Sequence, residues 1–194
     1  MSGNTRTKTA DRRVARTQGA LREALIALIL ERGWDETSVQ DVCDRANVGR
    51  STFYTYFASK EKLLISGFAE LRKALRALER SPTEPGAPLF GFIRGLIEHV
   101  GEHQRLFRAV IGKRSGIVIQ RRFRQFLIDL VKEDLVAGGI PAARRDAAAH
   151  YIAGALFELL TWWVDSRSAL APHDLEAVFR DLTTPALGAL QGAG

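Results

Sequence analysis

Apolar residues recur every three or four positions along most of the chain, which is the period of an amphipathic α-helix. The first clear stripe predicts a helix that ends at Gly33, because glycine accommodates the backbone of a helix end. Residues 1–9 carry no such stripe and are expected to form a flexible basic tail. The stripe consists of Leu21, Ala24, Leu25, Leu28 and Ile29.

A second, short helix is expected directly after the first. Ser38 precedes Asp41 by three residues, which is the spacing of a capping box at a helix N-terminus. The inner face of this helix is formed by Val39, Val42, Cys43 and Ala46. Asn47 and Gly49 then interrupt the pattern, because both residue types adopt turn and capping conformations easily.

A third helix is predicted from Arg50 to Tyr56, with Phe53 facing inward and polar side chains facing outward. Ser59 is a suitable cap for a longer helix that follows. The remaining helices are expected over 59–80, 88–102, 104–113, 117–136, 142–166 and from 172 onward, where Pro185 should kink or end the last one. Segment 142–166 is apolar on nearly every side, so two of its faces must be buried. One face would pack against the core of its own domain, and the other is a candidate for contact with a second subunit.

The predicted fold class is therefore all-α, with two domains. Residues 10–58 would form a three-helix DNA-binding domain of the helix-turn-helix type. Residues 59–194 would form a helical bundle that binds an effector and dimerises.

Charge and composition narrow the function without deciding it. The 194 residues carry a formal net charge of +6, which suits a polyanion such as DNA but also a membrane surface. A membrane span and a signal peptide are not expected, because no apolar run approaches the roughly 18 residues that a span needs, so we expect a cytoplasmic protein. The single cysteine, Cys43, excludes an internal disulfide, and neither a metal nor a cofactor is expected.

Two short helices joined by a tight turn can place the second helix in the major groove of DNA. Arg50 can contact a guanine through two hydrogen bonds, and Ser51 and Thr52 can reach base edges or phosphates. Tyr54, Tyr56 and Lys60 are placed to hold the DNA backbone. The candidate DNA-contacting residues are Ser38, Gln40, Arg50, Ser51, Thr52, Tyr54, Tyr56 and Lys60.

The segment from Thr37 to Leu64, TSVQDVCDRANVGRSTFYTYFASKEKLL, resembles the N-terminal signature of the TetR family. The resemblance implies a homodimeric repressor with three N-terminal helices for DNA and a helical remainder for ligand binding and dimerisation. Three positions depart from the family pattern: Asn47 replaces a glycine, Gly49 a serine and Ser51 a glycine. The Ser51 hydroxyl lies where DNA would bind, so the operator sequence cannot be transferred from a relative.

The C-terminal candidates rest on weaker patterns. Six residues are candidates for an effector pocket, although aromatic residues at helical spacing also suit an ordinary core: His99, Phe107, Phe123, Phe126, Tyr151 and Phe157. Four are candidates for a dimer interface: Trp162, Trp163, Leu175 and Phe179. Cys43 is interpreted as a core residue rather than a redox sensor.

The sequence thus predicts a ligand-responsive repressor that binds a palindromic operator as a homodimer. The alternative is a DNA-binding protein without an effector, or an activator controlled by a protein partner. A helical enzyme is disfavoured, because the four histidines form no catalytic constellation in the sequence; they are His99, His103, His150 and His173. Membrane association is disfavoured too, because no long amphipathic stripe with aromatic anchors accompanies the basic run.

Overall fold

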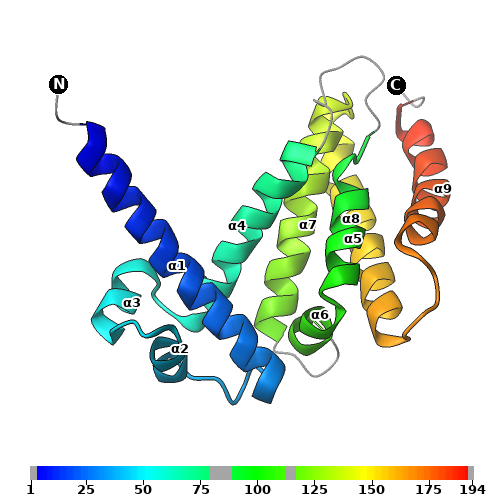
Figure 1. Ribbon diagram of the computed structural model, residues 1–194. Coiled ribbons are helices and arrows are strands. Elements are labelled where there is room, and N and C mark those ends of the chain that lie inside the picture. The colour runs from blue at the N-terminus through cyan, green and yellow to red at the C-terminus, as the bar shows by residue number, and fades with distance from the viewer. Residues whose placement is uncertain (1–3, 79–88, 112–116, 192–194) are drawn as a thin grey trace. The chain divides into compact units, whose positions relative to one another are not determined.

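The computed structural model describes residues 4–78, 89–111 and 117–191. Within these ranges every regular element is an α-helix, which confirms the all-α fold class (Figure 1). The chain divides into two compact units, residues 1–69 and 70–194. The first unit therefore includes the first half of a long helix that the sequence assigned wholly to the second domain.

The N-terminal unit consists of α1 (Asn4–Arg32), α2 (Val39–Ala46), α3 (Arg50–Tyr56) and the first part of α4 (Lys60–Leu78). The positions of α2 and α3 agree with the sequence prediction, and Gly33 ends α1 with a φ of 90°. The expectation of a flexible tail over residues 1–9 is not met, because α1 already begins at Asn4. Residues 4–18 contain neither glycine nor proline, so nothing local prevents the helix from extending toward the N-terminus.

The core of this unit is small and apolar. It combines side chains from all four helices and the turn after α3: Leu21, Leu25, Ile29, Val42, Cys43, Phe53, Phe57 and Leu63. Two ion pairs attach α2 to the end of α1. The Arg45 guanidinium donates to both carboxylate oxygens of Glu31, at 2.8 and 2.6 Å, and Arg32 contacts Asp41 at 2.8 Å. These contacts link α2 to the end of α1 at the surface of the unit.

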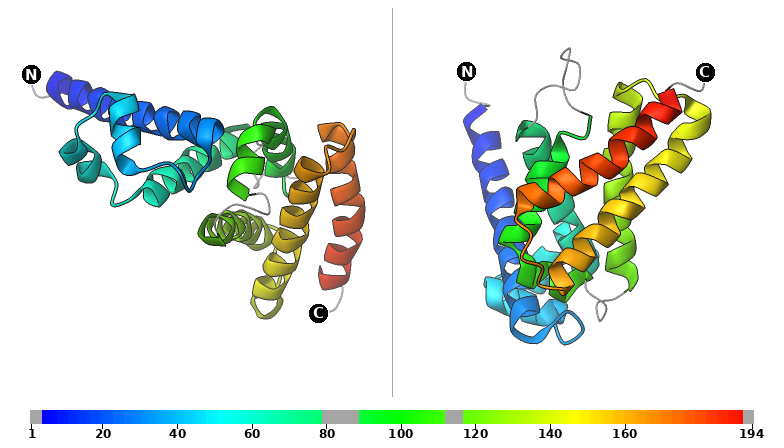
Figure 2. Two further views of the ribbon diagram at one scale, coloured as in Figure 1. Left: turned by 90° about the horizontal axis from the view of Figure 1, so that it is seen from below. Right: turned by 90° about the vertical axis from the view of Figure 1, so that its right-hand side faces the viewer.

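The C-terminal unit contains the end of α4 together with α5 (Phe92–Glu102), α6 (Gln104–Ile111), α7 (Ile117–Ala137), α8 (Ala142–Asp165) and α9 (Pro172–Gln191). Helix α7 packs against α8, and α5 packs against α9 (Figure 2). Pro185 does not end the last helix, which continues to Gln191. The expected linker at 81–86 lies outside the described residues, and among the helices described none is long and apolar enough to cross a membrane.

Arg76 joins the end of α4 to α7. Its guanidinium donates to the Asp134 carboxylate at 2.7 Å, to Glu133 at 2.9 Å and to the Leu130 carbonyl at 3.1 Å. Asp134 is buried, so this charge needs its partner. Substituting Arg76 alone would remove the guanidinium that neutralises this buried carboxylate.

Candidate nucleic-acid interface and effector pocket

Local hydrogen bonds fix the turn between α2 and α3. The Ser38 hydroxyl and backbone N–H both donate to the Asp41 carboxylate, and the Asp41 N–H donates back to the Ser38 hydroxyl oxygen at 3.2 Å. The predicted capping box is therefore present. Asn47 ends α2 in the left-handed conformation (φ 51°, ψ 47°), in which its N–H reaches the Asp44 carbonyl at 3.2 Å. Asparagine tolerates this conformation better than most residues, so it can replace the glycine of the family pattern.

Helix α3 has one buried face and one open face. Phe53 is fully buried, and its ring lies 5.9 Å from that of Phe57. Gly49 precedes the helix in an extended conformation and offers no side-chain cap. The exposed side chains are Arg50, Ser51, Tyr54 and Thr55, while Thr52 and Tyr56 are half-buried. A polar surface of this kind on a short, well-anchored helix suits insertion into the major groove.

The candidate DNA-contacting residues differ in whether their side chains already make hydrogen bonds within the protein. The Arg50 guanidinium lies 5.9 Å from the centre of the Tyr54 ring, so these two exposed side chains already form one patch. Gln40 donates to Asp44 at 2.7 Å on the exposed side of α2. The Ser38 hydroxyl, by contrast, is committed to the capping box.

Lys60 has a structural role that the sequence did not indicate. Its ammonium donates to the carbonyls of Trp34 and Thr37, both at 2.8 Å, and lies 4.4 Å from the centre of the Trp34 ring. The Thr37 hydroxyl in turn donates to the Gly33 carbonyl at 2.8 Å. Lys60 therefore anchors the loop between α1 and α2 from the start of α4.

Among the described residues of this unit, Glu31, Asp41, Cys43 and Arg45 have shifted pKa values, and those of Asp41 and Cys43 concern the helix-turn-helix most directly. Hydrogen bonds from Ser38, reinforced by Arg32, lower the pKa of Asp41 to about 2. Burial raises the pKa of the Cys43 thiol, with a further contribution from Asp44. A buried thiol with a raised pKa stays protonated at neutral pH, which favours the core interpretation of Cys43 over a redox sensor.

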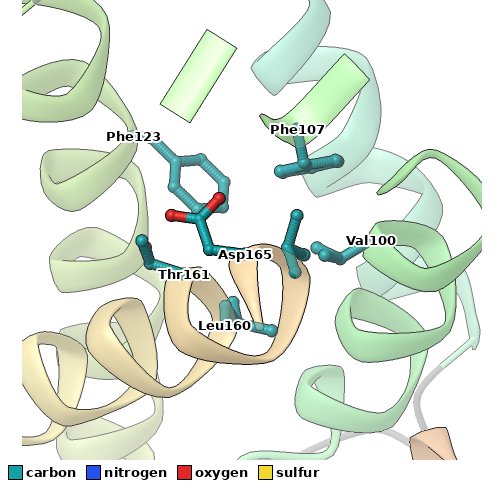
Figure 3. A pocket seen from close by; sticks show the side chains of 7 residues that line it. Val100, Phe107, Phe123, Leu160, Thr161 and Asp165 are labelled. Atoms are coloured by element: carbon teal, nitrogen blue, oxygen red, sulfur yellow. The ribbon is translucent and has the colours of Figure 1, made fainter. Parts of the chain in front are cut away.

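A small cavity of about 10 Å³ lies among α5, α6, α7 and α8 (Figure 3). Of the six residues expected to line a pocket, it includes Phe107 and Phe123. The other lining residues were not anticipated: Val100, Leu160, Thr161, Val164 and Asp165. Four of these five belong to the last turns of α8, where the spacing i, i+1, i+4, i+5 marks one helix face and offered a signal in the sequence.

The remaining pocket candidates lie elsewhere. Phe126 and Phe157 are buried beside Phe123, at ring distances of 5.9 and 6.2 Å, and belong to the surrounding core. His99 is half-buried with its ring 6.0 Å from that of Phe107. Tyr151 is 68% exposed and cannot line an internal pocket, because its position on α8 faces away from the core.

The dimer candidates separate in the same way. Trp162 is 50% exposed, whereas Trp163, Leu175 and Phe179 are buried within their own chain. The Trp163 indole N–H donates to the Leu170 carbonyl at 2.9 Å, which fixes the ring in the core. A residue that fills the core of its own subunit presents no surface to a partner, so these three expectations are corrected.

A helix-turn-helix with an exposed polar recognition helix, followed by a helical unit that encloses an apolar pocket, is the architecture of a DNA-binding transcriptional regulator. The family described as bacterial regulatory proteins, tetR family, matches residues 21–66. The chain is 31% identical over 150 residues to the HTH-type transcriptional regulator EthR of Mycolicibacterium smegmatis, covering 71% of this chain and 68% of that protein. The chain belongs to the TetR family of transcriptional regulators.

Two further comparisons agree with this assignment. The chain is 37% identical over 165 residues to an uncharacterized HTH-type transcriptional regulator of Bacillus subtilis, YxbF, covering 80% of this chain. It spans only 42% of the length of that relative. The crystal structure of a TetR transcriptional regulator from Streptococcus agalactiae superposes with a TM-score of 0.64 at 25% identity, over 91% of this chain and 98% of the other.

Proposed function

We propose that the protein is a homodimeric repressor that binds a palindromic operator through α3 and releases it when a small molecule occupies the pocket in the C-terminal unit. The observation that carries the DNA-binding part is the exposed polar face of α3, held in place by the buried Phe53. Arg50 and Ser51 at the start of that helix would read base edges. Thr52, Tyr54 and Tyr56, with Gln40 on α2, would contact the DNA backbone.

Exposed apolar side chains on α8 and α9 support dimerisation. Tyr151 and Trp162 are eleven residues apart, which places them on the same side of α8 three turns apart. Val178 and Leu182 are four residues apart on α9 and are 40% and 73% exposed. Large apolar residues exposed in this way favour burial against a second copy of the chain. A dimer would present two α3 helices to half-sites one helical turn of DNA apart, about 34 Å.

The pocket lining supports an effector with an apolar body, which would enter by displacing the side chains around the present cavity of about 10 Å³. Five apolar side chains surround the cavity together with the Thr161 hydroxyl and the Asp165 carboxylate. The Thr161 hydroxyl already donates to the Phe157 carbonyl at 2.8 Å, so Asp165 is the group better placed to pair with a ligand. We therefore expect a mostly apolar molecule that carries a positive charge or a hydrogen-bond donor.

The DNA-binding part is tested by selecting DNA from a random pool with the purified protein and titrating the recovered sequence at several salt concentrations. We expect a palindromic motif and an affinity that falls steeply with salt. Arg50→Ala should bind more weakly, and Arg144→Ala, a change at an exposed arginine of the C-terminal unit, provides the control. If the folded, dimeric protein enriches no sequence, specific operator binding is wrong.

The effector part is tested separately, once the operator is known. A panel of apolar amines and matched neutral compounds is screened for release of the operator. Release by an amine should weaken in Asp165→Asn and persist in Asp181→Asn, which removes an exposed carboxylate from α9. Operator binding that no compound in the panel changes would support the effector-independent alternative.

A further inference from the structure

Three metal-ligating side chains meet at the C-terminal end of α5. His99, Glu102 and His103 occupy positions i, i+3 and i+4, which share one face of a helix. One ligand atom of each residue lies within 4.8 Å of those of the other two. The sequence alone predicts no metal site, because its single cysteine and few histidines offer few ligands.

We propose that His99, Glu102 and His103 form a binding site for a divalent transition-metal ion of the zinc class. Two imidazoles and one carboxylate are a donor set that zinc uses in proteins, with a fourth position left for water or another ligand. Magnesium and calcium prefer sites built from oxygen donors, so two nitrogen ligands favour zinc over them.

The hydrogen bonding of His103 prepares it for this role. Its Nδ1 lies 2.9 Å from the backbone carbonyl oxygen of His99, and only a protonated Nδ1 can donate to that oxygen. In the neutral ring this tautomer leaves the lone pair on Nε2. Metal-binding histidines commonly direct their other ring nitrogen to a carbonyl in this way, which orients the ring and increases its basicity.

His99 supplies the second nitrogen. The centre of its ring lies 4.4 Å from that of His103, so the two imidazoles are close enough to share one ion. A neutral ring with a free lone pair is the form that binds a metal ion. The Glu102 carboxylate adds negative charge at the exposed edge of the site.

An ion at this position would stiffen the junction between α5 and α6. His103 is the last residue before α6, and its carbonyl accepts a hydrogen bond from the Phe107 N–H at 3.0 Å. The His99 ring also contacts the ring of Phe107, which lines the pocket. The proposed site therefore lies directly behind one wall of the cavity.

The experiment is a calorimetric titration of the full-length, metal-stripped chain with Zn²⁺ alone, without DNA. We expect one zinc ion per chain. His103→Ala should weaken binding about 100-fold or more, since loss of even an orienting group costs about 10- to 100-fold. Glu102→Gln should weaken it about 10-fold. Both residues are exposed, so neither substitution should disturb the fold, which circular dichroism would verify.

His150→Ala is the matched control. His150 is also exposed on a helix, and its Nδ1 makes the same contact with the carbonyl four residues earlier, at 2.9 Å. It should retain the affinity of the unmodified protein. The proposal is overturned if the chain binds no zinc, if His103→Ala binds as tightly as the unmodified chain, or if both histidine variants lose affinity equally. Because DNA is absent, the result does not depend on the proposed repressor function.

Discussion

One helix of each unit contains two adjacent aromatic residues, and in each pair one residue is buried and the other exposed. In α3, Phe53 is fully buried and Tyr54 is 50% exposed. In α8, Trp163 is 2% exposed and Trp162 is 50% exposed. Successive side chains on a helix point about 100° apart, so one member can fill the core while its neighbour faces outward. In each pair the outward residue is the candidate for binding a partner.

The two pairs differ in how clearly the sequence separates their members. The other outward residues of α3 are polar, so Phe53 stands out as the one that must turn inward. Helix α8 is apolar on nearly every side, and no local pattern separates Trp162 from Trp163. The residue that turns inward is identified only by a contact outside the helix, the hydrogen bond from the Trp163 indole N–H to the Leu170 carbonyl in the following loop.

The largest expected effect comes from removing the buried member of each pair. Phe53→Ala and Trp163→Ala should each lower the free energy of unfolding by about 3–5 kcal/mol, because both leave a large cavity in a core. Urea unfolding followed by helical circular dichroism measures this. Tyr54→Ala is the control and should change stability by no more than about 0.5 kcal/mol. Equal destabilisation by Phe53→Ala and Tyr54→Ala would contradict the division between them.

Trp162→Ala should instead weaken dimerisation, by about 2 kcal/mol if this side chain is a central anchor of the interface. Analytical ultracentrifugation over a range of protein concentrations would measure the change in the dissociation constant. Since a weakened dimer unfolds more easily when dilute, the loss of apparent stability should depend on protein concentration. Trp163→Ala should lose stability at every concentration. An unchanged dimer in Trp162→Ala would place the interface elsewhere.

Substitutions on the outer face of α3 should act on DNA affinity rather than on stability. Arg50→Ala should cost about 1–3 kcal/mol of operator binding and relax base preference at one position. Tyr54→Ala should weaken binding to all base-substituted operators alike, because a backbone contact carries no sequence information. Fluorescence anisotropy with a panel of such operators separates the two outcomes. The same uniform loss for both variants would refute a base-reading role for Arg50.

Lys60→Met tests a contact that the sequence did not reveal. It removes two hydrogen bonds from an ammonium to carbonyls, and hydrogen bonds to charged groups contribute about 1.5–3 kcal/mol each. Because the lysine is only half-buried, we expect a loss nearer the lower figure, measured by urea unfolding. Lys62→Met is the control, because Lys62 is an exposed lysine two residues further along the same helix. Weaker DNA binding with unchanged stability would favour direct phosphate contact by Lys60.

Local features were predictable from the sequence, and distant contacts were not. The capping box at Ser38, the turn at Asn47 and the bounds of α3 depend on neighbouring residues, and the structure confirms them. The Lys60 ammonium bonds to carbonyls 26 and 23 residues earlier, which no local pattern encodes. The pocket lining has the same origin, because Val100 and Asp165 meet only through the packing of α5 and α8.

The smallest expected effect concerns the pH dependence of the N-terminal unit. The pKa of Asp41 is lowered from 3.8 to about 2 by the hydrogen bonds of the capping box and by Arg32. A group with a lowered pKa in the folded state stabilises the fold above its unfolded pKa and loses that contribution as the pH falls toward the folded value. The stabilisation by Asp41 should therefore be complete at neutral pH and should fade between about pH 4 and pH 2.

Asp41→Asn should accordingly be less stable than the unmodified chain at pH 7, and the two should converge as the pH approaches 2. Because Asp41 lies at the surface, the difference should be small and should shrink as salt is added, which screens its attraction to Arg32. Urea unfolding at a series of pH values measures the convergence, and a carboxyl titration by NMR assigns it to Asp41. A constant difference in stability between the two proteins from pH 7 to pH 2 would contradict this prediction. It would mean that Asp41→Asn is destabilised by altered packing or hydrogen-bond geometry, and that the charge of Asp41 does not contribute.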